Sequence, residues 1–308
     1  MTNAKRENGQ FFTVGNPFVH PAFHEWATLC EIPANPILEP FAGANSLIKH
    51  LRNMKLCESA SCYDIIPADS EVKKRDTLQS FPQGFNVCIT NPPWLAKNSA
   101  TVRGLPFPEC KHDDLYKYAL EKCLKHCQWV AALVPESFIR AKIFQERLTD
   151  FISLTSQMFI DTGHPVGLAL FSPNQSDDVK VWSQNIPIGN LSDIELLRLQ
   201  PQADKPDISF NDPDGNLGLI ALDNTYTASI RFCPVDELSQ YKVKPSGRHI
   251  TKLKVKGRLR INAWNQYLND FRKKTCDVLL TSYKGIRKDG MYRRRLDWNL
   301  ARGIIHNV

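Results

Sequence analysis

The sequence feature that most constrains the fold is the tetrapeptide Asn91-Pro92-Pro93-Trp94, which directly follows the apolar, partly β-branched run 85–90. Two consecutive prolines cannot continue a sheet ladder or a helix, because proline lacks a backbone N–H and its ring fixes φ. A buried strand over 85–90 must therefore end here, and the chain must leave the core along a stiff path. Open α/β sheets bind ligands at the carboxyl ends of their strands, so the tetrapeptide predicts a functional site in such a fold.

The same four residues suit a planar base that carries an exocyclic amine. The Asn91 side-chain oxygen and the Pro92 carbonyl are hydrogen-bond acceptors, and neither proline offers a competing N–H. Together they could accept hydrogen bonds from both N–H groups of an amine. Trp94 offers a flat surface on which the ring can stack, a contact worth roughly 1–3 kcal/mol. Taken alone, the tetrapeptide could also be an ordinary Pro-Pro turn beside a half-buried tryptophan, so other motifs must decide.

A second motif lies earlier in the chain, in the segment 36–47. Its residues predict a short strand, a turn of small residues and a helix that Ser46 is placed to cap. Such a turn lets a ligand approach the backbone at Gly43, and Glu39 could bind a cationic amine. Asn45 tolerates the left-handed conformation that this turn requires better than other residues with a side chain.

Two further acidic residues follow expected strands. A strand over 61–66 contains Asp64, 25 positions beyond Glu39. An acid about 20 residues after a glycine turn can accept hydrogen bonds from ribose hydroxyls, which gives Asp64 that role. Asp76 follows a shorter strand, and as a residue type it could simply cap the turn that comes next.

The order of these motifs resembles the γ class of amino-group DNA methyltransferases. The order is an amino-terminal Phe-Thr stretch, the 36–47 turn, the two acids and then the Asn-Pro-Pro-Trp tetrapeptide. In that family Asn-Pro-Pro-aromatic usually marks transfer to N6 of adenine, whereas cytosine-N4 enzymes more often carry serine in place of the asparagine. The turn resembles the family's Asp/Glu-Pro-Phe-x-Gly-x-Gly loop, with Asn45 as the departure from its second glycine. The resemblance covers roughly residues 10–182 and implies an α/β, Rossmann-like sheet of seven strands, mostly parallel, with one antiparallel strand.

The resemblance also implies a role for each motif. The cofactor S-adenosylmethionine is expected to contact Thr13, Glu39, Phe41, Gly43, Asn45, Asp64 and Asp76. Thr13 would lie beside its methionine part, and Asp76 would accept a hydrogen bond from its adenine amino group. The target base is expected to lie against Asn91, Pro92, Pro93 and Trp94, with Phe171 on its other face. Packing as ordinary aromatic residues is an equal alternative for Phe11, Phe12 and Phe171.

The positive charge is concentrated in the last part of the chain. Residues 241–308 carry 18 Lys and Arg against four Asp and no Glu, a net charge of +14, whereas residues 1–240 carry a net charge of −7. This asymmetry suggests that the last third grips a polyanion. We therefore expect a catalytic domain over residues 1–184 and a basic target-recognition domain over residues 185–308 that binds double-stranded DNA.

The clearest basic pattern is the segment 251–261, where basic residues alternate with mostly apolar ones. Alternate side chains of a strand point to the same face, so the segment predicts one basic face suited to a nucleic acid. The expected DNA contacts are Lys252, Lys254, Lys256, Arg258 and Arg260, together with Arg248, Arg293, Arg294 and Arg295. Candidates for contacting bases are Tyr283, Tyr292, Trp298 and Arg248.

The remaining periodicity predicts helices near 21–29, 114–124 and 142–151 and buried strands over 129–135 and 166–171. The last of these strands is expected to pair with residues 179–182. Residues 95–113 are either an ordinary surface loop or a loop that closes over a bound base. Residues 210–216 contain Asn-Asp-Pro-Asp-Gly and predict the connection of a hairpin.

The bulk properties bound the class of protein. A chain of 308 residues is long enough for a full core and a second, smaller domain. It has no run of eighteen or more apolar residues, so no membrane partner is expected, and residues 1–8 lack the apolar core of a signal peptide. Nine cysteines without a Cys-x-x-Cys pair suggest reduced, structural thiols rather than a zinc site. These features predict a cytoplasmic protein whose chemistry requires no metal.

The expected reaction is transfer of a methyl group from S-adenosylmethionine to N6 of an adenine flipped out of duplex DNA. Flipping costs a few kcal/mol, which stacking would recover. The resemblance allows a cognate restriction endonuclease, acting separately, as a further partner. Adenine in structured RNA and the glutamine side chain of a protein present the same planar amine and are alternative substrates. A catalytically inactive DNA-binding module is another alternative, against which the intact Glu39, Asp64, Asp76 and Asn91 count.

Overall fold

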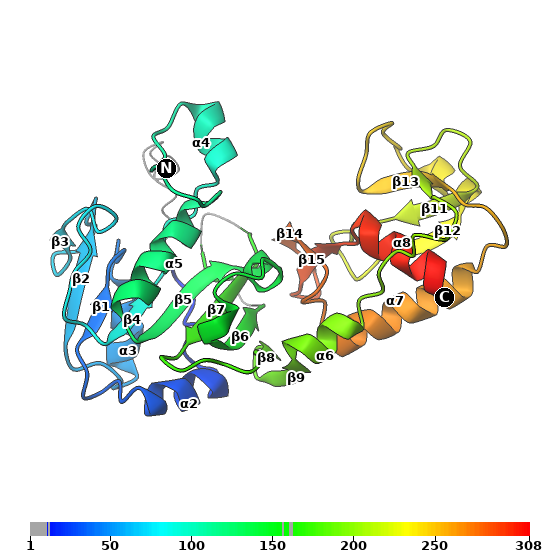
Figure 1. Ribbon diagram of the computed structural model, residues 1–308. Coiled ribbons are helices and arrows are strands. Elements are labelled where there is room, and N and C mark those ends of the chain that lie inside the picture. The colour runs from blue at the N-terminus through cyan, green and yellow to red at the C-terminus, as the bar shows by residue number, and fades with distance from the viewer. Residues whose placement is uncertain (1–10, 12, 156, 160–162) are drawn as a thin grey trace. The chain divides into compact units, whose positions relative to one another are not determined.

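The computed structural model describes residues 11, 13–155, 157–159 and 163–308. The chain forms two compact units, Met1–Pro187 and Ile188–Val308 (Figure 1). Phe12, for which aromatic packing is one expectation, lies outside the described residues. No helix in the described part of the chain is both long and apolar enough to cross a membrane.

The first unit is built on a nine-stranded sheet with the order β3-β2-β1-β4-β5-β7-β6-β8-β9 (Figure 1). β1 pairs in parallel with β2 and β4, β2 with β3 and β4 with β5, whereas β7 is antiparallel to both neighbours, β5 and β6. The expected Rossmann-like sheet, mostly parallel with one antiparallel strand, is therefore confirmed, and β8 and β9 extend it. The strands are β1 (Ile37–Glu39), β2 (Ala60–Asp64), β3 (Lys73–Lys74), β4 (Val87–Thr90), β5 (Trp129–Pro135), β6 (Leu148–Leu154), β7 (Val166–Phe171), β8 (Lys180–Ser183) and β9 (Ile186–Asn190).

Helices pack on both faces of this sheet, and alternation along β4 shows how. Val87 and Ile89 belong to the same buried cluster as residues of α2 (Pro21–Leu29) and α3 (Ser46–Asn53). Cys88, between them, instead lies beside Cys123 of α5 (Leu115–His126). Because successive side chains of a strand point to opposite faces, a strand covered on both sides is buried throughout, as β4 is.

The turn between β1 and α3 has the left-handed backbone that its small residues permit. Asn45 has a φ of 61°, as expected for a residue in place of glycine, and Gly43 has a φ of 49°. Ser46 is the first residue of α3 and not its cap, because Asn45 occupies the position before the helix. The small residues of the turn, Ala42 to Ala44, therefore leave the backbone accessible near the end of β1, beside the Phe41 side chain.

Two expectations about the end of this sheet are wrong. Residues 142–151 do not form one helix, because a short 3₁₀ turn at Gln145–Arg147 leads directly into β6. β8 pairs in parallel with β6 and not with β7, since β6 lies between the two. The second half of β6 is buried on both faces, so its residues show no alternation that would predict a strand.

The segment 95–113 is also not all loop, because it contains α4 (Lys97–Arg103).

The second unit contains a four-stranded antiparallel sheet with the order β10-β13-β11-β12 and a separate hairpin, β14–β15 (Figure 1). Residues 210–216 connect β10 to β11, but these strands lie on opposite sides of β13, so the expected hairpin is wrong. The helices and strands of the second unit are α6 (Leu191–Leu196), β10 (Ser209–Phe210), β11 (Leu217–Ile220), β12 (Arg231–Pro234), β13 (Ile250–Lys254), α7 (Ile261–Thr275), β14 (Thr281–Ile286), β15 (Tyr292–Arg295) and α8 (Trp298–Asn307). It also contains the short 3₁₀ turn η3 (Val235–Gln240). The described residues of the first unit contain two such turns, η1 (Glu136–Arg140) and η2 (Gln145–Arg147).

The basic strand expected over 251–261 is shorter than its pattern suggests. β13 ends at Lys254, and Gly257, with a φ of 92°, turns the chain out of extended structure. Only Lys252 and Lys254 lie in the strand. The other three expected contacts lie in the loop before α7, namely Lys256, Arg258 and Arg260. The five side chains do not share one strand face, so the expected basic track is wrong.

A group of buried charges centred on Asp223 holds the second unit together. The Asp223 carboxylate is fully buried and accepts hydrogen bonds from both terminal nitrogens of Arg272, at 2.9 Å each, and from Arg287 at 2.8 Å. Its backbone carbonyl accepts two more from Arg293, at 2.8 and 2.7 Å. Burial alone would raise the pKa of Asp223, but hydrogen bonds and positive charge from Arg272 hold it below its ordinary value. These arginines therefore serve the folding of the unit.

Candidate active site

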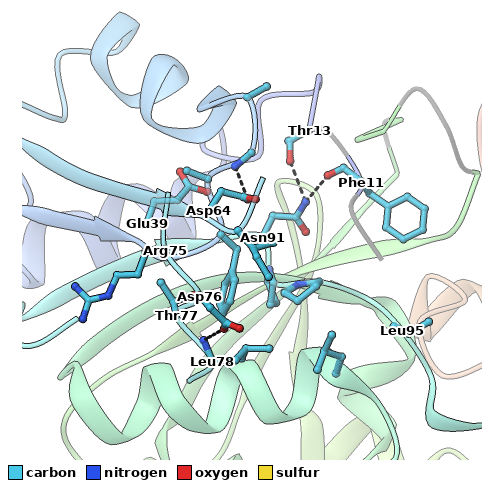
Figure 2. A pocket seen from close by; sticks show the side chains of 18 of the residues that line it. Phe11, Thr13, Glu39, Asp64, Arg75, Asp76, Thr77, Leu78, Asn91 and Leu95 are labelled. Carbon is cyan, nitrogen blue, oxygen red and sulfur yellow. Dashed lines mark hydrogen bonds between the residues drawn. The ribbon is translucent and has the colours of Figure 1, made fainter. Parts of the chain in front are cut away.

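A pocket opens at the carboxyl ends of β1, β2 and β4, which are neighbours in the sheet of the first unit (Figure 2). After β1 the chain adds β2 and β3 on one side and then returns to add β4 on the other. Ligands of open α/β sheets bind at such a switch point. The pocket brings together nine of the residues predicted to contact a cofactor or a base, namely Thr13, Glu39, Phe41, Gly43, Asp64, Asp76, Asn91, Pro92 and Pro93.

The Gly43 turn is tied to the end of β2 by Asp64. The Gly43 N–H donates to Asp64 Oδ2 at 2.8 Å, and the Ile66 N–H donates to Asp64 Oδ1 at the same distance. These two hydrogen bonds fix the direction of the Asp64 carboxylate at the wall of the pocket. The side chain is nearly buried, which fixes its direction into the pocket.

Glu39 is the most unusual group in the pocket. Only 1% of its surface is exposed, and its Oε2 has no hydrogen-bond partner among the described residues. Burial raises the pKa of Glu39 well above its ordinary value, and the nearby Asp64 carboxylate raises it further. A buried carboxyl oxygen without a donor is costly, so this position fits a ligand that brings a donor or a positive charge.

Asp76 lies at another wall of the pocket and also caps a turn. Its Oδ1 accepts from the backbone N–H groups of Leu78, at 3.1 Å, and Gln79, at 3.2 Å, so the turn-capping alternative is confirmed as part of its role. No motif indicated several other lining residues, most of which lie in loops, whereas Leu115 begins α5. They are Arg75, Leu78, Leu95, Leu105, Pro106 and Leu115, and the leucines give the pocket apolar surface suited to a flat ring.

Asn91 is held by the start of the described chain. Its Nδ2 donates to the Phe11 carbonyl at 2.8 Å and lies 3.3 Å from Thr13 Oγ1 (Figure 2). A carbonyl oxygen can only accept, so the nitrogen of the amide must face it, and the orientation of the Asn91 amide is fixed. Its oxygen, Oδ1, is buried and has no hydrogen-bond partner among the described residues. The site therefore presents a fixed, unused acceptor.

Trp94 does not line this pocket; it is half-buried in an aromatic cluster with Phe11, which does. Its ring centroid lies 5.7 Å from that of Phe11 and 5.2 Å from that of Phe159, which meets it edge-on at 88°. Phe11 also packs against Phe159 at 5.7 Å, which confirms aromatic packing for Phe11. No motif indicated Phe159, which lies in the irregular segment between β6 and β7.

Phe171 and Asn45 do not lie where their expected roles require. Because β7 is antiparallel to β5, Phe171 at its end pairs with the start of β5, whereas Asn91 follows the end of β4. Phe171 is fully buried, so its predicted stacking role is wrong and the core alternative is confirmed. Asn45 is also fully buried and donates to Glu71 at 3.2 Å. It shapes the turn but does not line the pocket, which corrects its assignment as a cofactor contact.

The basic residues expected to contact DNA differ in their exposure. Arg294 is only 1% exposed and cannot reach a phosphate, so its assignment is wrong, and the candidate base reader Tyr292 is equally buried. The ammonium groups of Lys252 and Lys254 lie 3.5 and 3.0 Å from backbone carbonyls of the preceding loop. The exposed members are Arg248, Lys254, Lys256, Arg258 and Arg260, while Lys252, Arg293 and Arg295 are half-buried.

The fold and the pocket define a Rossmann-like α/β protein with a ligand site at the switch point of its sheet. The sequence matches no protein-family model and no curated protein. Among solved structures it is similar to the type I restriction-modification system methyltransferase subunit from Streptococcus thermophilus, with 16% identity and a TM-score of 0.38 over 55% of this chain and 47% of that one.

Two other similar structures are the type I restriction enzyme EcoKI M protein and the DrdV–DNA complex. The EcoKI M protein is 13% identical, with a TM-score of 0.36 over 51% of this chain and 47% of that one. DrdV is 13% identical, with a TM-score of 0.41 over 59% of this chain and 28% of that one. The chain thus spans about half the length of the two methyltransferase subunits and less than a third of the length of DrdV. All three TM-scores are below 0.5, so function is inferred from the pocket itself.

Proposed function

We propose that this protein transfers a methyl group from S-adenosylmethionine to N6 of an adenine flipped out of duplex DNA. The observation that carries the proposal is the unused Asn91 oxygen, buried at the pocket that Glu39, Gly43 and Asp64 also line. A buried acceptor of this kind calls for a donor from the substrate. The order of motifs, which resembles the γ class of adenine methyltransferases, names the amine that would supply it.

The pocket residues fit S-adenosylmethionine. Glu39, buried with an unpaired oxygen, would hold the cationic amine of the methionine part, and the Gly43 turn gives backbone access beside it. Asp64 would accept from the ribose hydroxyls and Asp76 from the adenine amino group. The apolar surface of Leu78, Leu105 and Leu115 would border the adenine ring. When bound, the cofactor supplies an electrophilic methyl group that an amine nitrogen can attack directly.

The chain's own contribution to transfer is to position the target amine. Asn91 Oδ1 and the Pro92 carbonyl would each accept a hydrogen bond from one N–H of the amine. These two hydrogen bonds direct the lone pair of the nitrogen away from both oxygens. Holding the nitrogen in line for attack replaces a bimolecular encounter with a fixed geometry, a large part of many rate enhancements. The half-buried Trp94 would stack on the base, and the buried Phe159 packs edge-on against the Trp94 ring.

The proposal is tested by expression in cells that lack DNA methylation, followed by mapping of modified bases across the genome. N6-methyladenine at one recurring sequence is the expected result. Unmodified DNA, with methylation instead in RNA or on glutamine of a protein, would overturn the assignment of duplex DNA as substrate.

Glu39→Gln is expected to weaken binding of S-adenosylmethionine by roughly 10- to 100-fold, the value of a hydrogen bond to a charged group. Because the pKa of Glu39 is raised in the ligand-free protein, a cationic amine that binds there should ionise the carboxyl and release a proton. Affinity should therefore increase as the pH rises through that raised pKa. Calorimetry in buffers of different ionisation enthalpy measures the proton release. Proton release that persists in Glu39→Gln, or the same weakening in the exposed control Glu58→Gln, would contradict the role of Glu39.

Thr13→Val separates two roles for Thr13. If Thr13 orients Asn91, as its 3.3 Å contact indicates, the variant should lower kcat by about 2- to 10-fold and leave the Kd for the cofactor unchanged. If Thr13 instead contacts the methionine part, the Kd should increase and kcat should change little. Steady-state kinetics and calorimetry decide between them, with Thr28→Val, on the exposed side of α2, as the control.

A further inference from the structure

The second unit carries two stacks of cationic and aromatic side chains that meet at consecutive residues. In the first stack, the Arg293 guanidinium lies 5.1 Å from the Tyr283 ring centroid, and the His249 ring meets Tyr283 edge-on at 5.2 Å. In the second, the Arg248 guanidinium lies 5.9 Å from the ring centroid of Trp298. The two stacks lie close together because Ala221 joins their segments: its N–H donates to the His249 carbonyl at 2.7 Å, and its carbonyl accepts from the Leu296 N–H at 2.8 Å.

This 248–298 surface, which consists of Arg248, His249, Tyr283, Arg293, Arg295 and Trp298, is strongly positive. Partial burial and then the charges of Arg295, Arg293 and Lys244 hold the pKa of His249 below its ordinary value. No acidic side chain among the described residues forms an ion pair with Arg248, Arg293, Arg295 or Lys244. In contrast, Arg272 and Arg287 are neutralised by Asp223, Asp277 and Asp289.

The surface is also rigid, because β15 is fastened to Asp223 from two directions. The Arg293 guanidinium donates twice to the Asp223 carbonyl, and the Arg294 N–H donates to Asp223 Oδ2 at 3.1 Å. A backbone bridge between Leu222 and Arg295 continues the same contact. Tyr283 is thus held in place by a neighbour that is itself fixed, which lowers the entropy lost when a ligand binds.

We propose that the 248–298 surface is where the second unit holds duplex DNA, an inference that rests on the proposed function. Arg248 and Arg295 contact phosphates, and the Tyr283 ring packs against a sugar or an unstacked base, whereas the Trp298 ring is already stacked on Phe210 at 4.6 Å. Guanidinium groups without an acidic partner, beside flat rings, match the charge and the faces of a nucleic acid. None of the large exposed apolar side chains of the described residues belongs to this surface, so it offers little to a membrane.

Charge-matched variants separate this surface from the 251–261 segment. Arg248→Gln/Arg295→Gln removes two positive charges from the surface, and Lys256→Gln/Arg258→Gln removes two from the exposed loop that follows β13. Binding of a fluorescent duplex is measured by anisotropy over a range of salt concentrations. The first variant is expected to bind about tenfold more weakly, with the slope of log K against log salt reduced by about 2, one for each lost phosphate contact. The control should keep the wild-type slope.

Tyr283→Leu tests the stacking contact without a change of charge. It is expected to weaken binding of the duplex by about tenfold with no change in the salt slope, and to leave binding of heparin, which has no bases, at the wild-type level. Equal loss in the Lys256→Gln/Arg258→Gln control, or equal loss of heparin binding in Tyr283→Leu, would overturn the inference. Wild-type protein that does not bind the duplex would overturn it too.

The binding assay distinguishes this inference from the proposed function, because it does not depend on methyl transfer. DNA binding through the 248–298 surface without any transfer would leave the inference standing and remove the proposed reaction. Transfer to DNA with binding unaffected by all surface variants would do the reverse.

Discussion

Asn91→Ala is expected to lower the rate of methyl transfer by at least about 100-fold, as loss of a single preorganised polar contact in an active site commonly does. The variant removes the fixed Oδ1 acceptor, so one proton of the target amine loses its partner and the lone pair is no longer directed. Glu39, Gly43 and Asp64 are untouched, so the Kd for S-adenosylmethionine should stay within about twofold. Single-turnover transfer of a labelled methyl group, with calorimetry for the cofactor, measures both quantities.

The control for this variant is Asn53→Ala, at the exposed end of α3, which should transfer at the wild-type rate. Full activity of Asn91→Ala would mean that the tetrapeptide does not hold the acceptor. Loss of cofactor binding together with activity would mean that Asn91 acts on the pocket's structure and not on the amine.

Asp223→Asn is expected to destabilise the second unit by about 3–5 kcal/mol, the usual effect of removing one partner from a buried charge pair. Arg272 would retain Asp277, whereas Arg287 would retain only Asp277 at 3.9 Å and the partly exposed Asp289. The hairpin β14–β15 would keep its contacts to the backbone of Leu222 and Asp223 but lose the charge pair between Arg287 and Asp223. We expect proteolysis to attack residues 188–308 first, while the first unit still binds S-adenosylmethionine. Thermal unfolding and limited proteolysis measure the change.

The matched control is Asp270→Asn on α7, whose carboxylate is exposed and, among the described residues, accepts hydrogen bonds from Gln266. The pH dependence gives a second check, because the pKa of Asp223 is lower in the folded protein than in the unfolded chain. Its stabilisation is complete above the unfolded pKa and is lost as the pH falls through the folded pKa. Wild type and Asp223→Asn should therefore converge in acid. An unchanged unfolding temperature at neutral pH would contradict this account.

The parts of the site that could be predicted from sequence are those fixed by local backbone chemistry. Two prolines after an apolar run must end a strand, and a small-residue turn must expose its backbone, so Asn91 and Gly43 were placed at strand ends without knowledge of the fold. Asp64 followed from its distance along the chain, because one strand and one helix separate it from the turn. The sheet then brings these three ends together, since the strands that carry them are neighbours.

The parts that could not be predicted depend on strand direction and on long-range partners. Phe171 is aromatic, as the stacking role requires. Because β7 is antiparallel to β5, however, Phe171 lies at the opposite end of the strands from the pocket. The alternation over 251–261 does not reveal that Gly257 ends the strand. One signal for Arg294 was present in the sequence. Alternate residues of a strand point to the same face, so among the three consecutive arginines Arg294 points inward together with Tyr292. Its buried environment, however, is supplied by Asp223, about seventy residues away.

The most direct test of the central claim is to incubate the purified protein with duplex DNA and S-adenosylmethionine that carries a deuterated methyl group, and then to analyse the digested nucleosides by mass spectrometry. We predict deuterated N6-methyladenine in the wild-type reaction and none with Asn91→Ala. Label on another base, or none on the DNA while the cofactor is bound in the pocket at Glu39, would contradict the proposed reaction.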